Sequence, residues 1–419
     1  MAKIVLATFG SLGDLHPKIA LGLELKRRGH GVTIAAMDFY REKIETIGLG
    51  FARMAPHLDP DDKEAVRDLM DAATGTENIL RGVIMPSLWE MYRDLTVAVE
   101  NADALLTGEI VYAAPSVVEK TGIKWISTSL APISLFSAYD PPVPPPAPWF
   151  EHLRFLGPSF HQAFFRFMRW NVRGWYEQYK EFRNDIGLDP DHDPIFTDKF
   201  SGLLHLVMFS KILGKPQPDW PESSVQTGFC LYDGQNDFGQ MPEGLNDFLD
   251  VGDPPVVFTL GSAAVMDAGT FYTESVKAAN LIGRRAVLLY GIDNEPPPGL
   301  DDNIAAFEYA PYSRVFPRAA CVVHSGGIGT TAQVLRAGIP HLIMPYGNDQ
   351  PDNAARCRRL GVAEVIGRGE YTAKSAATRL RGLLGETSYK SCAAGAAAVA
   401  RTEYGTTAAC DAIERVLRN

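Results

Sequence analysis

The chain of 419 residues has few cysteines and no excess of positive charge. Its five cysteines are an odd number at wide spacings and include no Cys-x-x-Cys pair. This pattern disfavours a disulfide framework and a zinc site, and it predicts a cytoplasmic protein. Lysine and arginine number 40 against 50 acidic residues, which gives a formal net charge of −10. The acidic balance argues against non-specific nucleic-acid binding and against electrostatic docking on anionic lipid, because both depend on Lys and Arg.

Long apolar runs are also missing. No stretch of about 18 apolar residues occurs, so the sequence predicts no membrane-spanning helix. The opening sequence MAKIVLATFG is too short an apolar run for a secretion signal and fits a first buried strand better. The overall composition, 46% apolar and 21% charged, is that of an ordinary globular protein. At roughly 150 residues per domain, the length fits two or three domains, and two large ones fit equally well.

Apolar runs alternate with helical patterns in both halves of the chain. Residues 3–8 form a continuous apolar run, 15–28 show helical spacing with a basic end before a glycine, and 32–36 form a second run. This order predicts a βαβ unit and an α/β first half. Around residues 213–253 the pattern gives way to Gly, Pro, Asp and Asn. A second α/β series follows from residue 255, so we expect a linker between two α/β domains.

The most informative segment is the glycine-rich sequence HSGGIGTT at residues 324–331. It follows a short apolar run and precedes a helical pattern. Glycines allow backbone N–H groups to approach an anion closely, and a helix N-terminus adds partial positive charge, worth about 0.3–1 kcal/mol. The segment predicts a diphosphate cradle, and it is not a Walker loop because no Gly-Lys-Ser/Thr follows. The alternative is a turn that uses glycine only for its backbone angles.

Two further clusters also follow predicted strands. The sequence PYGNDQ at 345–350 contains Asp349 and Gln350, whose acceptor and donor groups suit sugar hydroxyls. Ligands of open α/β sheets bind at the carboxyl ends of the strands, so this cluster and the glycine-rich segment are expected to meet at one ligand. The alternative for Asp349 and Gln350 is a helix N-cap. Ser262, after the strand predicted at 255–260, is placed to bond a phosphate oxygen, and a simple turn is nearly as good an account.

The N-terminal sequence GSLGDLHP, residues 10–17, also follows a strand and opens a helix. Asp14 is then a carboxylate in the cleft between the domains, where it is a candidate general base. Its alternative role is to cap the helix expected to begin at Leu15. His16 is the rival base, although a lone histidine near a helix start is more often structural.

Residues 141–148, PPVPPPAP, are too rich in proline for a helix or a central strand. An aromatic-rich helical stretch follows at 149–182. The simplest interpretation is that these helices pack on the first domain. Alternatively, some of the rings line a groove for an apolar ligand, with Trp149 and Phe150 as candidate contacts.

These motifs resemble the family of GT-B nucleotide-sugar glycosyltransferases related to plant natural-product, sterol and antibiotic glycosyltransferases. The resemblance is strongest from Glu308 to Gly361, and GSLGDLHP supports it at the N-terminus. The sequence YDPP at 139–142, with the prolines after it, is similar to the bacterial branch that includes rhamnolipid-type and flavonoid rhamnosyltransferases. The resemblance implies two facing Rossmann-like domains, with a C-terminal helix that crosses back to the first domain. It also implies transfer with inversion at the anomeric carbon, without a metal.

On this resemblance, the chain divides into an acceptor-binding domain at 1–215, a linker region at 216–250, a donor-binding domain at 251–403 and a C-terminal helix at 404–419. The expected partners are a nucleotide-diphosphate sugar and a small apolar acceptor, with no other cofactor.

The resemblance also implies roles for single residues. Asp14 falls at the position of the catalytic base, Asp349 and Gln350 fall at the sugar, and Tyr309 stands where plant members have a tryptophan that stacks on the nucleotide base. The implied diphosphate contacts are His324 and the amides around Gly326, Gly327, Gly329 and Thr330. From their places in the sequence alone, Ser262 is added to the donor contacts, and His16, Trp149 and Phe150 are the candidate acceptor contacts.

Two departures from the family pattern bear on the donor and the base. Plant members pair the base with an aspartate, where this chain has Gly108 followed by Glu109. They also hold the ribose hydroxyls with a glutamate, where this chain has Ala332 followed by Gln333. A site without that carboxylate has less reason to demand a 2′-hydroxyl, which favours dTDP-rhamnose as donor, with UDP-glucose next. A flavonoid-type phenol is the leading acceptor, and a hydroxy fatty acyl lipid or a sterol follows.

Three other classes of protein are weighed against this one. A nicotinamide oxidoreductase would use Asp38 after the second strand, but its fingerprint requires glycine where this chain has Thr8. A sugar-nucleotide epimerase on the same architecture would need no acceptor, and a non-catalytic binding protein would need no base. Asp-x-Asp sequences, typical of metal-dependent transferases, occur at 59–61, 189–191 and 191–193, where loops in water are the better account.

Overall fold

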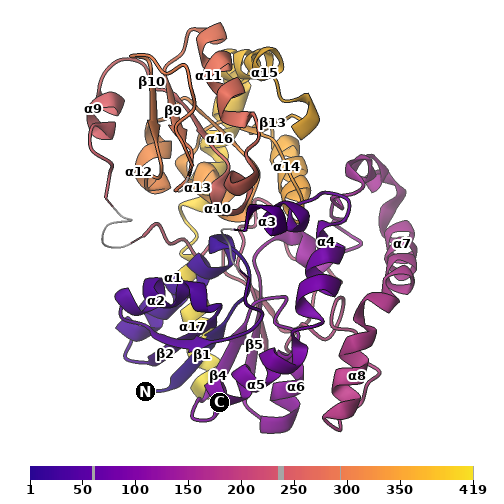
Figure 1. Ribbon diagram of the computed structural model, residues 1–419. Helices are drawn as coiled ribbons and strands as arrows, with labels where there is room; N and C mark the ends of the chain where they lie inside the picture. The colour runs from indigo at the N-terminus through magenta and orange to yellow at the C-terminus, as the bar shows by residue number, and fades with distance from the viewer. Residues whose placement is uncertain (59–61, 235–239, 293, 419) are drawn as a thin grey trace.

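The computed structural model describes residues 1–58, 62–234, 240–292 and 294–418, and it contains a parallel sheet in each half of the chain (Figure 1). The first sheet has the order β3-β2-β1-β4-β5-β6-β7 and the second the order β10-β9-β8-β11-β12-β13. The strands of the first sheet are β1 (Lys3–Ala7), β2 (Gly31–Ala36), β3 (Gly50–Arg53), β4 (Ala104–Thr107), β5 (Lys124–Ser129), β6 (Leu204–Val207) and β7 (Ser224–Gln226). Those of the second are β8 (Val256–Thr259), β9 (Ala286–Leu289), β10 (Ile304–Phe307), β11 (Cys321–His324), β12 (His341–Ile343) and β13 (Ala363–Val365).

Helices connect the strands and cover both faces of each sheet. The helices of the first half are α1 (Leu12–Arg27), η1 (Asp38–Tyr40), α2 (Arg41–Thr46), α3 (Lys63–Leu69), α4 (Gly75–Glu77), η2 (Asn78–Ile84), α5 (Leu88–Val99), α6 (Ala114–Thr121), η3 (Pro132–Leu135), η4 (Pro148–Leu156), α7 (Gly157–Asn171), η5 (Arg173–Tyr176) and α8 (Glu177–Asp185). Those of the second half are α9 (Leu245–Asp250), α10 (Gly261–Ala264), η7 (Val265–Asp267), α11 (Phe271–Ile282), α12 (Tyr312–Val315), η8 (Phe316–Arg318), α13 (Ile328–Ala337), α14 (Gln350–Arg359), η9 (Arg368–Glu370), α15 (Ala373–Gly385), α16 (Thr387–Ala400) and α17 (Gly405–Arg418).

The central strands β1, β4 and β8 are apolar except for one terminal residue each, as expected of parallel strands that are buried on both faces. Strand β4 is wholly buried, and so are β8 and β9. Within the described ranges, no helix combines the length and the apolar character that crossing a bilayer requires. The predicted α/β architecture of two Rossmann-like domains is confirmed.

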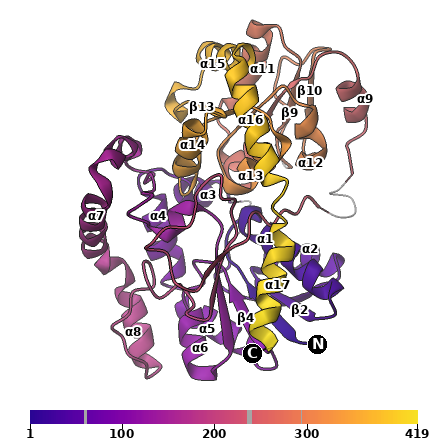
Figure 2. The same cartoon turned by 180° about the vertical axis from the view of Figure 1, so that it is seen from behind.

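The last helix returns to the first domain. Figure 2 shows α16 and α17 running down the back of the molecule, from the second domain to the first. Ala409, Cys410 and Ile413 of α17 are buried in the core of the first domain. Arg28, at the end of α1, pairs with Asp411 at 2.6 Å. The predicted crossing of the C-terminal helix is therefore present in the structure.

A buried arginine joins the two domains. Arg356 of α14 donates from Nε to Asp352 Oδ2 at 2.8 Å and from Nη1 to the carbonyl of Leu213 at 2.8 Å. It also pairs with Asp140 of the first domain. Asp352 accepts a bond from the backbone N–H of Val143 at 3.0 Å. The proline-rich segment thus lies against α14 of the donor domain, where its prolines need no ladder bonds.

Two predicted boundaries are corrected. The predicted linker region, 216–250, includes β7 (Ser224–Gln226), which pairs with β6 and completes the first sheet. The short strand has only three residues, so its apolar pattern is too brief to stand out from the surrounding Gly, Pro and Asp. Helix α1 begins at Leu12 rather than at Leu15, because Ser11 caps it one turn earlier.

Candidate active site

Asp14 is held at the first turn of α1, directly after β1. It forms a capping box with Ser11: the Ser11 hydroxyl accepts a bond from Gly13 N–H at 3.1 Å, and Asp14 Oδ2 accepts one from Ser11 N–H at 2.9 Å. A Cβ at Gly10, where φ is +129°, would lie 2.2 Å from Asp14 Oδ2. Glycine at this position therefore leaves room for the carboxylate. The helix-capping role considered for Asp14 is real, and it fixes the carboxylate in place.

The environment of Asp14 raises its pKa from 3.8 to about 7. Burial is the largest cause, and the charge of Asp349 from the second domain is the next. The bond from Ser11 and the charge of Lys18 act in the opposite direction. A carboxyl group with a pKa near neutrality is suited to take a proton from a substrate, because a useful fraction is ionised while its conjugate acid stays stable.

Lys18 lies one turn further along α1 and has no exposed surface. Its Nζ donates to Thr128 Oγ1 at 2.6 Å, and Thr128 donates in turn to the carbonyl of Thr107 at 2.9 Å. Burial lowers the pKa of Lys18 to about 8, while the charges of Asp14 and Glu109 favour its protonated form. Lys18 was not predicted from the sequence. Its i, i+4 spacing from Asp14 was the available signal, since this spacing places two side chains on one helix face.

Glu109 does not form a pair with Asp14. Its Oε1 accepts a bond from Leu130 N–H at 3.1 Å, and its Oε2 lies 3.9 Å from Lys199 Nζ. It acts on Asp14 only through its charge, as a minor contribution to the raised pKa. In the described part of the chain, Asp14 therefore has a buried lysine near it and no hydrogen bond to another carboxylate.

His16, the rival base, is held neutral. Burial lowers its pKa to about 3, and its ring packs edge-to-face on Tyr232 with centroids 5.2 Å apart. Its Nε2 is buried and has no hydrogen-bond partner among the described residues. An imidazole with so low a pKa is a weak base, which favours Asp14 over His16. Contact of His16 with an acceptor stays a prediction.

The glycine-rich segment forms the turn between β11 and α13. Gly326 has a φ of +91°, and a Cβ there would lie 2.8 Å from Ile343 Cγ2. Gly327 and Gly329 face open space, since no atom lies within 4 Å of their Cβ positions. Gly326 thus serves the turn and the packing, while Gly327 and Gly329 leave space for an anion at the N-terminus of α13. Thr330 is buried, with its Oγ1 beside Gly261 of α10.

His324 is turned into the protein. Its Nδ1 accepts a bond from Gly326 N–H at 3.0 Å, and its Nε2 lies 2.8 Å from His341 Nδ1. Burial and the neighbouring His341 keep the pKa of His324 well below its usual value, so the ring is neutral. In this geometry His324 stabilises the glycine turn from the protein interior, through its bond with Gly326 N–H. Direct contact with a diphosphate requires one of these bonds to break, and it stays a prediction.

Asp349 links the two loops of the second domain. Its Oδ2 accepts bonds from Ile328 N–H at 3.2 Å and from Asn353 Nδ2 at 2.7 Å, so it lies at the N-terminus of α13. Burial raises its pKa to about 6. Gln350 is buried, and its Oε1 accepts a bond from Tyr346 N–H at 2.9 Å. The two clusters lie in contact through Asp349, while Gln350 directs its oxygen to the backbone; a ligand shared by the two clusters stays a prediction.

A second missed residue lies beside Tyr309. Asp233, which follows the first sheet, accepts bonds from Gln333 Nε2 at 3.3 Å and from Ser313 N–H at 2.8 Å. Its charge is among the causes that raise the pKa of Tyr309. The ring centroids of Tyr309 and Tyr312 lie 6.3 Å apart. The carboxylate that the sequence lacks near Gln333 is thus supplied from a segment one hundred residues away.

The remaining predicted residues are less well placed. Ser262 is exposed at the start of α10, near the glycine turn. Trp149 is exposed, and Phe150 is 1% exposed with its ring 4.4 Å from Phe164. The prediction that Phe150 contacts an acceptor disagrees with this position, because the ring has no surface left to offer. Phe150 instead joins η4 to α7, which agrees with the simpler packing interpretation.

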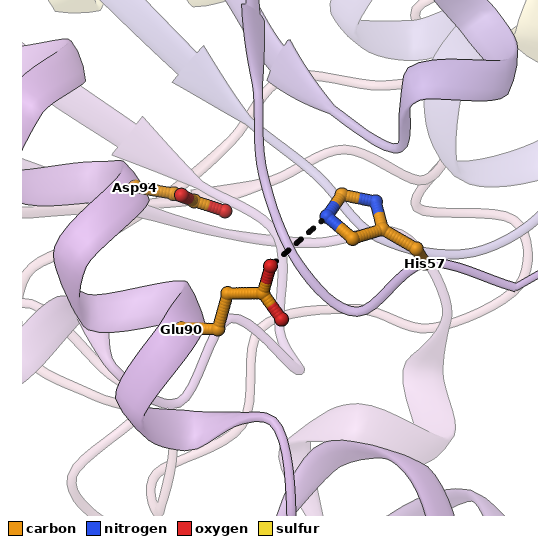
Figure 3. Close-up of side chains that lie close together, drawn as sticks. All are labelled: His57, Glu90 and Asp94. Atoms are coloured by element: carbon orange, nitrogen blue, oxygen red, sulfur yellow. Dashed lines mark ion pairs between the residues drawn. The ribbon is translucent and has the colours of Figure 1, made fainter.

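One group of side chains has the composition of a metal site. His57, Glu90 and Asp94 lie close together near α5 (Figure 3). The Nε of Arg53 donates to His57 Nε2 at 2.7 Å, and its Nη2 reaches Glu90 Oε1 at 3.3 Å. Asp94 accepts a bond from Ala55 N–H at 2.9 Å. An arginine therefore holds the position that a cation would need, and the group forms an ion-pair cluster.

The Asp-x-Asp sequences have structural roles where they are described. Asp189 accepts a bond from Asp191 N–H at 3.0 Å, and Asp193 Oδ1 accepts bonds from the N–H groups of Ile195 and Phe196 at 3.1 and 3.0 Å. Asp59 and Asp61 lie outside the described residues.

The chain is similar in sequence to glycosyltransferases in both halves. Residues 4–99 match the model for the glycosyltransferase family 28 N-terminal domain, and residues 293–407 match that for the erythromycin biosynthesis protein CIII-like C-terminal domain. O-mycaminosyltylonolide 6-deoxyallosyltransferase of Streptomyces fradiae is 32% identical over 388 residues, which span 86% of this chain and 84% of that protein.

Solved structures agree on the fold. The glycotransferase of kitacinnamycin superposes with a TM-score of 0.75 at 21% identity, covering 99% of both chains. The spinosyn rhamnosyltransferase SpnG, complexed with thymidine diphosphate, superposes with a TM-score of 0.68 at 17% identity, covering both chains completely (100%).

The two facing Rossmann-like domains, with a carboxylate on one side and a glycine turn on the other, define a GT-B glycosyltransferase. The chain belongs to the antibiotic and natural-product family of nucleotide-sugar glycosyltransferases. This assignment confirms the enzyme class and sets aside the oxidoreductase and the non-catalytic binding protein. Asp38, which an oxidoreductase would use, pairs with Arg41 at 2.7 Å.

Proposed function

We propose that this enzyme transfers a sugar with inversion, without a metal, and with Asp14 as the general base. The observation that carries the proposal is the Asp14 carboxylate, fixed by its cap bond and brought to a pKa of about 7 by burial and by Asp349. Asp349 also has a raised pKa, of about 6, but it belongs to the donor loops themselves and bonds to Ile328 N–H there.

The proposed reaction follows from the two sides of the cleft. The acceptor hydroxyl gives its proton to Asp14 as its oxygen forms a bond to the anomeric carbon. The bond from that carbon to the diphosphate oxygen breaks, and its electron pair leaves with the nucleoside diphosphate. Attack from the face opposite the leaving group inverts the anomeric centre. The amides at the start of α13 and the helix dipole stabilise the charge that develops on the diphosphate.

For the donor we propose dTDP-rhamnose, with UDP-glucose as the alternative. The spinosyn enzyme, whose fold this chain shares, is a rhamnosyltransferase that binds thymidine diphosphate, which supports the first choice. Asp233 supports the second, because it offers a carboxylate for ribose hydroxyls beside Gln333. Tyr309 is partly buried next to this pair and is the proposed stacking platform for the base.

For the acceptor we propose a flavonoid-type phenol, with a lipid or sterol alcohol next. The ring centroids of Phe136 and Phe196 lie 4.8 Å apart beside α7, in the half of the molecule proposed to bind the acceptor. Such rings suit a flat apolar acceptor.

The proposal is tested first by donor binding and then by turnover. UDP- and dTDP-sugars are compared by thermal shift, where the preferred donor gives the largest stabilisation at equal concentration. That donor is then incubated with phenols, lipids and sterols, and the products are identified by mass spectrometry and by the anomeric configuration. Glycosides that form at an undiminished rate in EDTA support the proposal. A retained configuration, or activity that only Mg²⁺ or Mn²⁺ restores, contradicts it. Conversion of the donor without any acceptor supports the epimerase instead.

A further inference from the structure

Helix α7 has an inner face that packs on the first domain and an outer face without a partner. His161 is fully buried, and Phe165 reaches Phe136 with ring centroids 6.2 Å apart. Figures 1 and 2 both show α7 at the outer edge of the molecule, with only one side against the rest of the domain. The opposite side of the helix faces water.

The outer face is aromatic. Phe160, Phe167 and Trp170 are 37%, 59% and 59% exposed, and their spacing places them in one stripe along the helix. Phe155, at the end of η4, is 80% exposed. Phe167 and Trp170 stack on each other with centroids 6.1 Å apart. We call these four residues the aromatic stripe. Protein surfaces seldom leave so many large rings together in water unless the patch binds something.

Positive charge accompanies the aromatic stripe. Residues 152–176 contain four arginines and no aspartate or glutamate, in a chain whose net charge is −10. Two of the four, Arg154 and Arg169, form ion pairs with acidic residues of other segments. Arg166 and Arg173 are exposed, and no ion pair of either is found among the described residues. On the helical wheel of α7, Arg166 adjoins the stripe on one side. Arg173 follows α7 in η5 and lies over the Trp170 ring at 4.7 Å.

The charge is also positive at the far end of the stripe. Glu151 of η4 pairs with both Arg358 and Arg359 of α14, so its single charge is more than balanced. Acidic residues return only with Glu177, at the start of α8. Along η4, α7 and the end of α14, the arginines therefore outnumber the acidic residues of these same elements.

We propose that the outer face of η4 and α7 docks on a lipid bilayer that carries anionic headgroups. The rings of the aromatic stripe enter the interface between headgroups and acyl chains, and the arginines meet the headgroup charges. The net charge of −10 disfavours such docking, but it is the charge of the whole chain and not of this face. Electrostatic forces at physiological salt reach about 8 Å, so the charge of the contacting face decides.

Vesicle flotation with the full chain tests this proposal. We expect the protein to float with vesicles of phosphatidylglycerol and phosphatidylcholine at low salt, and to be released at high salt. It should not float with vesicles of phosphatidylcholine alone. The double variant Phe167→Ser, Trp170→Ser should lose at least about tenfold in vesicle affinity, because two large rings no longer leave water. Arg166→Glu, Arg173→Glu should lose the preference for anionic vesicles.

A matched control is Phe39→Ser, which removes an aromatic ring that is 54% exposed elsewhere on the first domain. It should float like the unchanged chain. Light scattering after size exclusion is run in parallel on all variants. Failure to float with either vesicle, or equal floating of all variants, overturns the proposal. A dimer that dissociates in the Phe167→Ser, Trp170→Ser variant also overturns it, because a second copy of the chain then covers the stripe.

Discussion

Asp14 and Asp349 belong to different domains, and the negative charge of Asp349 raises the pKa of Asp14. Each carboxylate also accepts backbone N–H bonds at the start of a helix, Asp14 at α1 and Asp349 at α13. The pKa of both is raised by burial, to about 7 and about 6. The arrangement of the two domains thus brings the donor-side Asp349 close enough to the proposed base for its charge to act on the ionisation of Asp14.

The first prediction concerns Asp14→Asn. The amide keeps an oxygen that can accept the Ser11 bond, but it cannot take a proton, so kcat should fall by about 10²–10⁴-fold while the Kd of the donor changes little. Turnover and calorimetric titration with the nucleoside diphosphate measure the two. Asp38→Asn is a control on the same domain. A variant with near-normal kcat contradicts the assignment of the base.

The same variant should be more stable than the unchanged chain at alkaline pH. The folded state binds the Asp14 proton more tightly than the unfolded state, so stability falls as pH rises from about 4 to about 7. Asp14→Asn removes this loss. We expect its Tm to exceed that of the unchanged chain at pH 8 and to match it near pH 4. A lower Tm at pH 8 contradicts the raised pKa.

The second prediction concerns the pH dependence of kcat/KM. The base must be ionised, so activity should rise with pH through a value near 7. Asp349→Asn removes the like charge and should move this limb to lower pH, while Asp302→Asn, an exposed acid of the second domain, should not move it. An unchanged limb in Asp349→Asn would mean that the two carboxylates do not interact.

Replacing Lys18 should shift the pH dependence of kcat/KM in the opposite direction. Its charge lowers the pKa of Asp14, so Lys18→Met should move the acid limb of kcat/KM to higher pH and reduce turnover at pH 7. Lys26→Met is the control, because Lys26 is exposed on the same helix and bonds only to the carbonyl of Gly48 in the described structure. Reduced kcat with an unshifted limb would assign Lys18 a packing role alone.

The main features of the site were predictable because they follow strands. Asp14, the glycine turn and Asp349 each come directly after a predicted strand, and the ends of parallel strands meet at one edge of a sheet. The inward orientation of His324 was not predictable, since it depends on His341 in the neighbouring strand. Asp233 was missed for the same reason: its bond to Gln333 spans one hundred residues, and no local pattern reports such a contact.

Asp233 leads to a prediction on nucleotide choice. If its carboxylate binds the ribose 2′-hydroxyl, Asp233→Asn should weaken the binding of UDP by about tenfold or more, because a hydrogen bond to a charged group contributes that much to affinity. Thymidine diphosphate lacks that hydroxyl, so the affinity for it should fall less. Calorimetry with both nucleotides measures the difference, with Asp247→Asn on α9 as the control. Equal losses of affinity for the two nucleotides would mean that Asp233 does not distinguish between them.

The last prediction concerns the domain contact at Arg356. This arginine is 2% exposed and balances Asp352, which is fully buried, and Asp140 of the other domain. Arg356→Met leaves the buried Asp352 without its cation and leaves Asp140 with Arg154 alone, and we expect a loss of about 3–5 kcal/mol in the free energy of unfolding. Arg358→Met, an exposed neighbour on α14, should cost far less.

Acid should reduce the difference between Arg356→Met and the unchanged chain. Burial raises the pKa of Asp140, but the charges and hydrogen bonds of Arg356 and, to a smaller extent, of Arg154 outweigh it and hold that pKa below 3.8. The stability gained from the pair is therefore present above pH 4 and is lost as the pH falls through the lowered value. Urea midpoints at pH 7 and near pH 3 measure this. An equal difference at both pH values would mean that Arg356 stabilises the contact through packing and its bond to Leu213 rather than through charge.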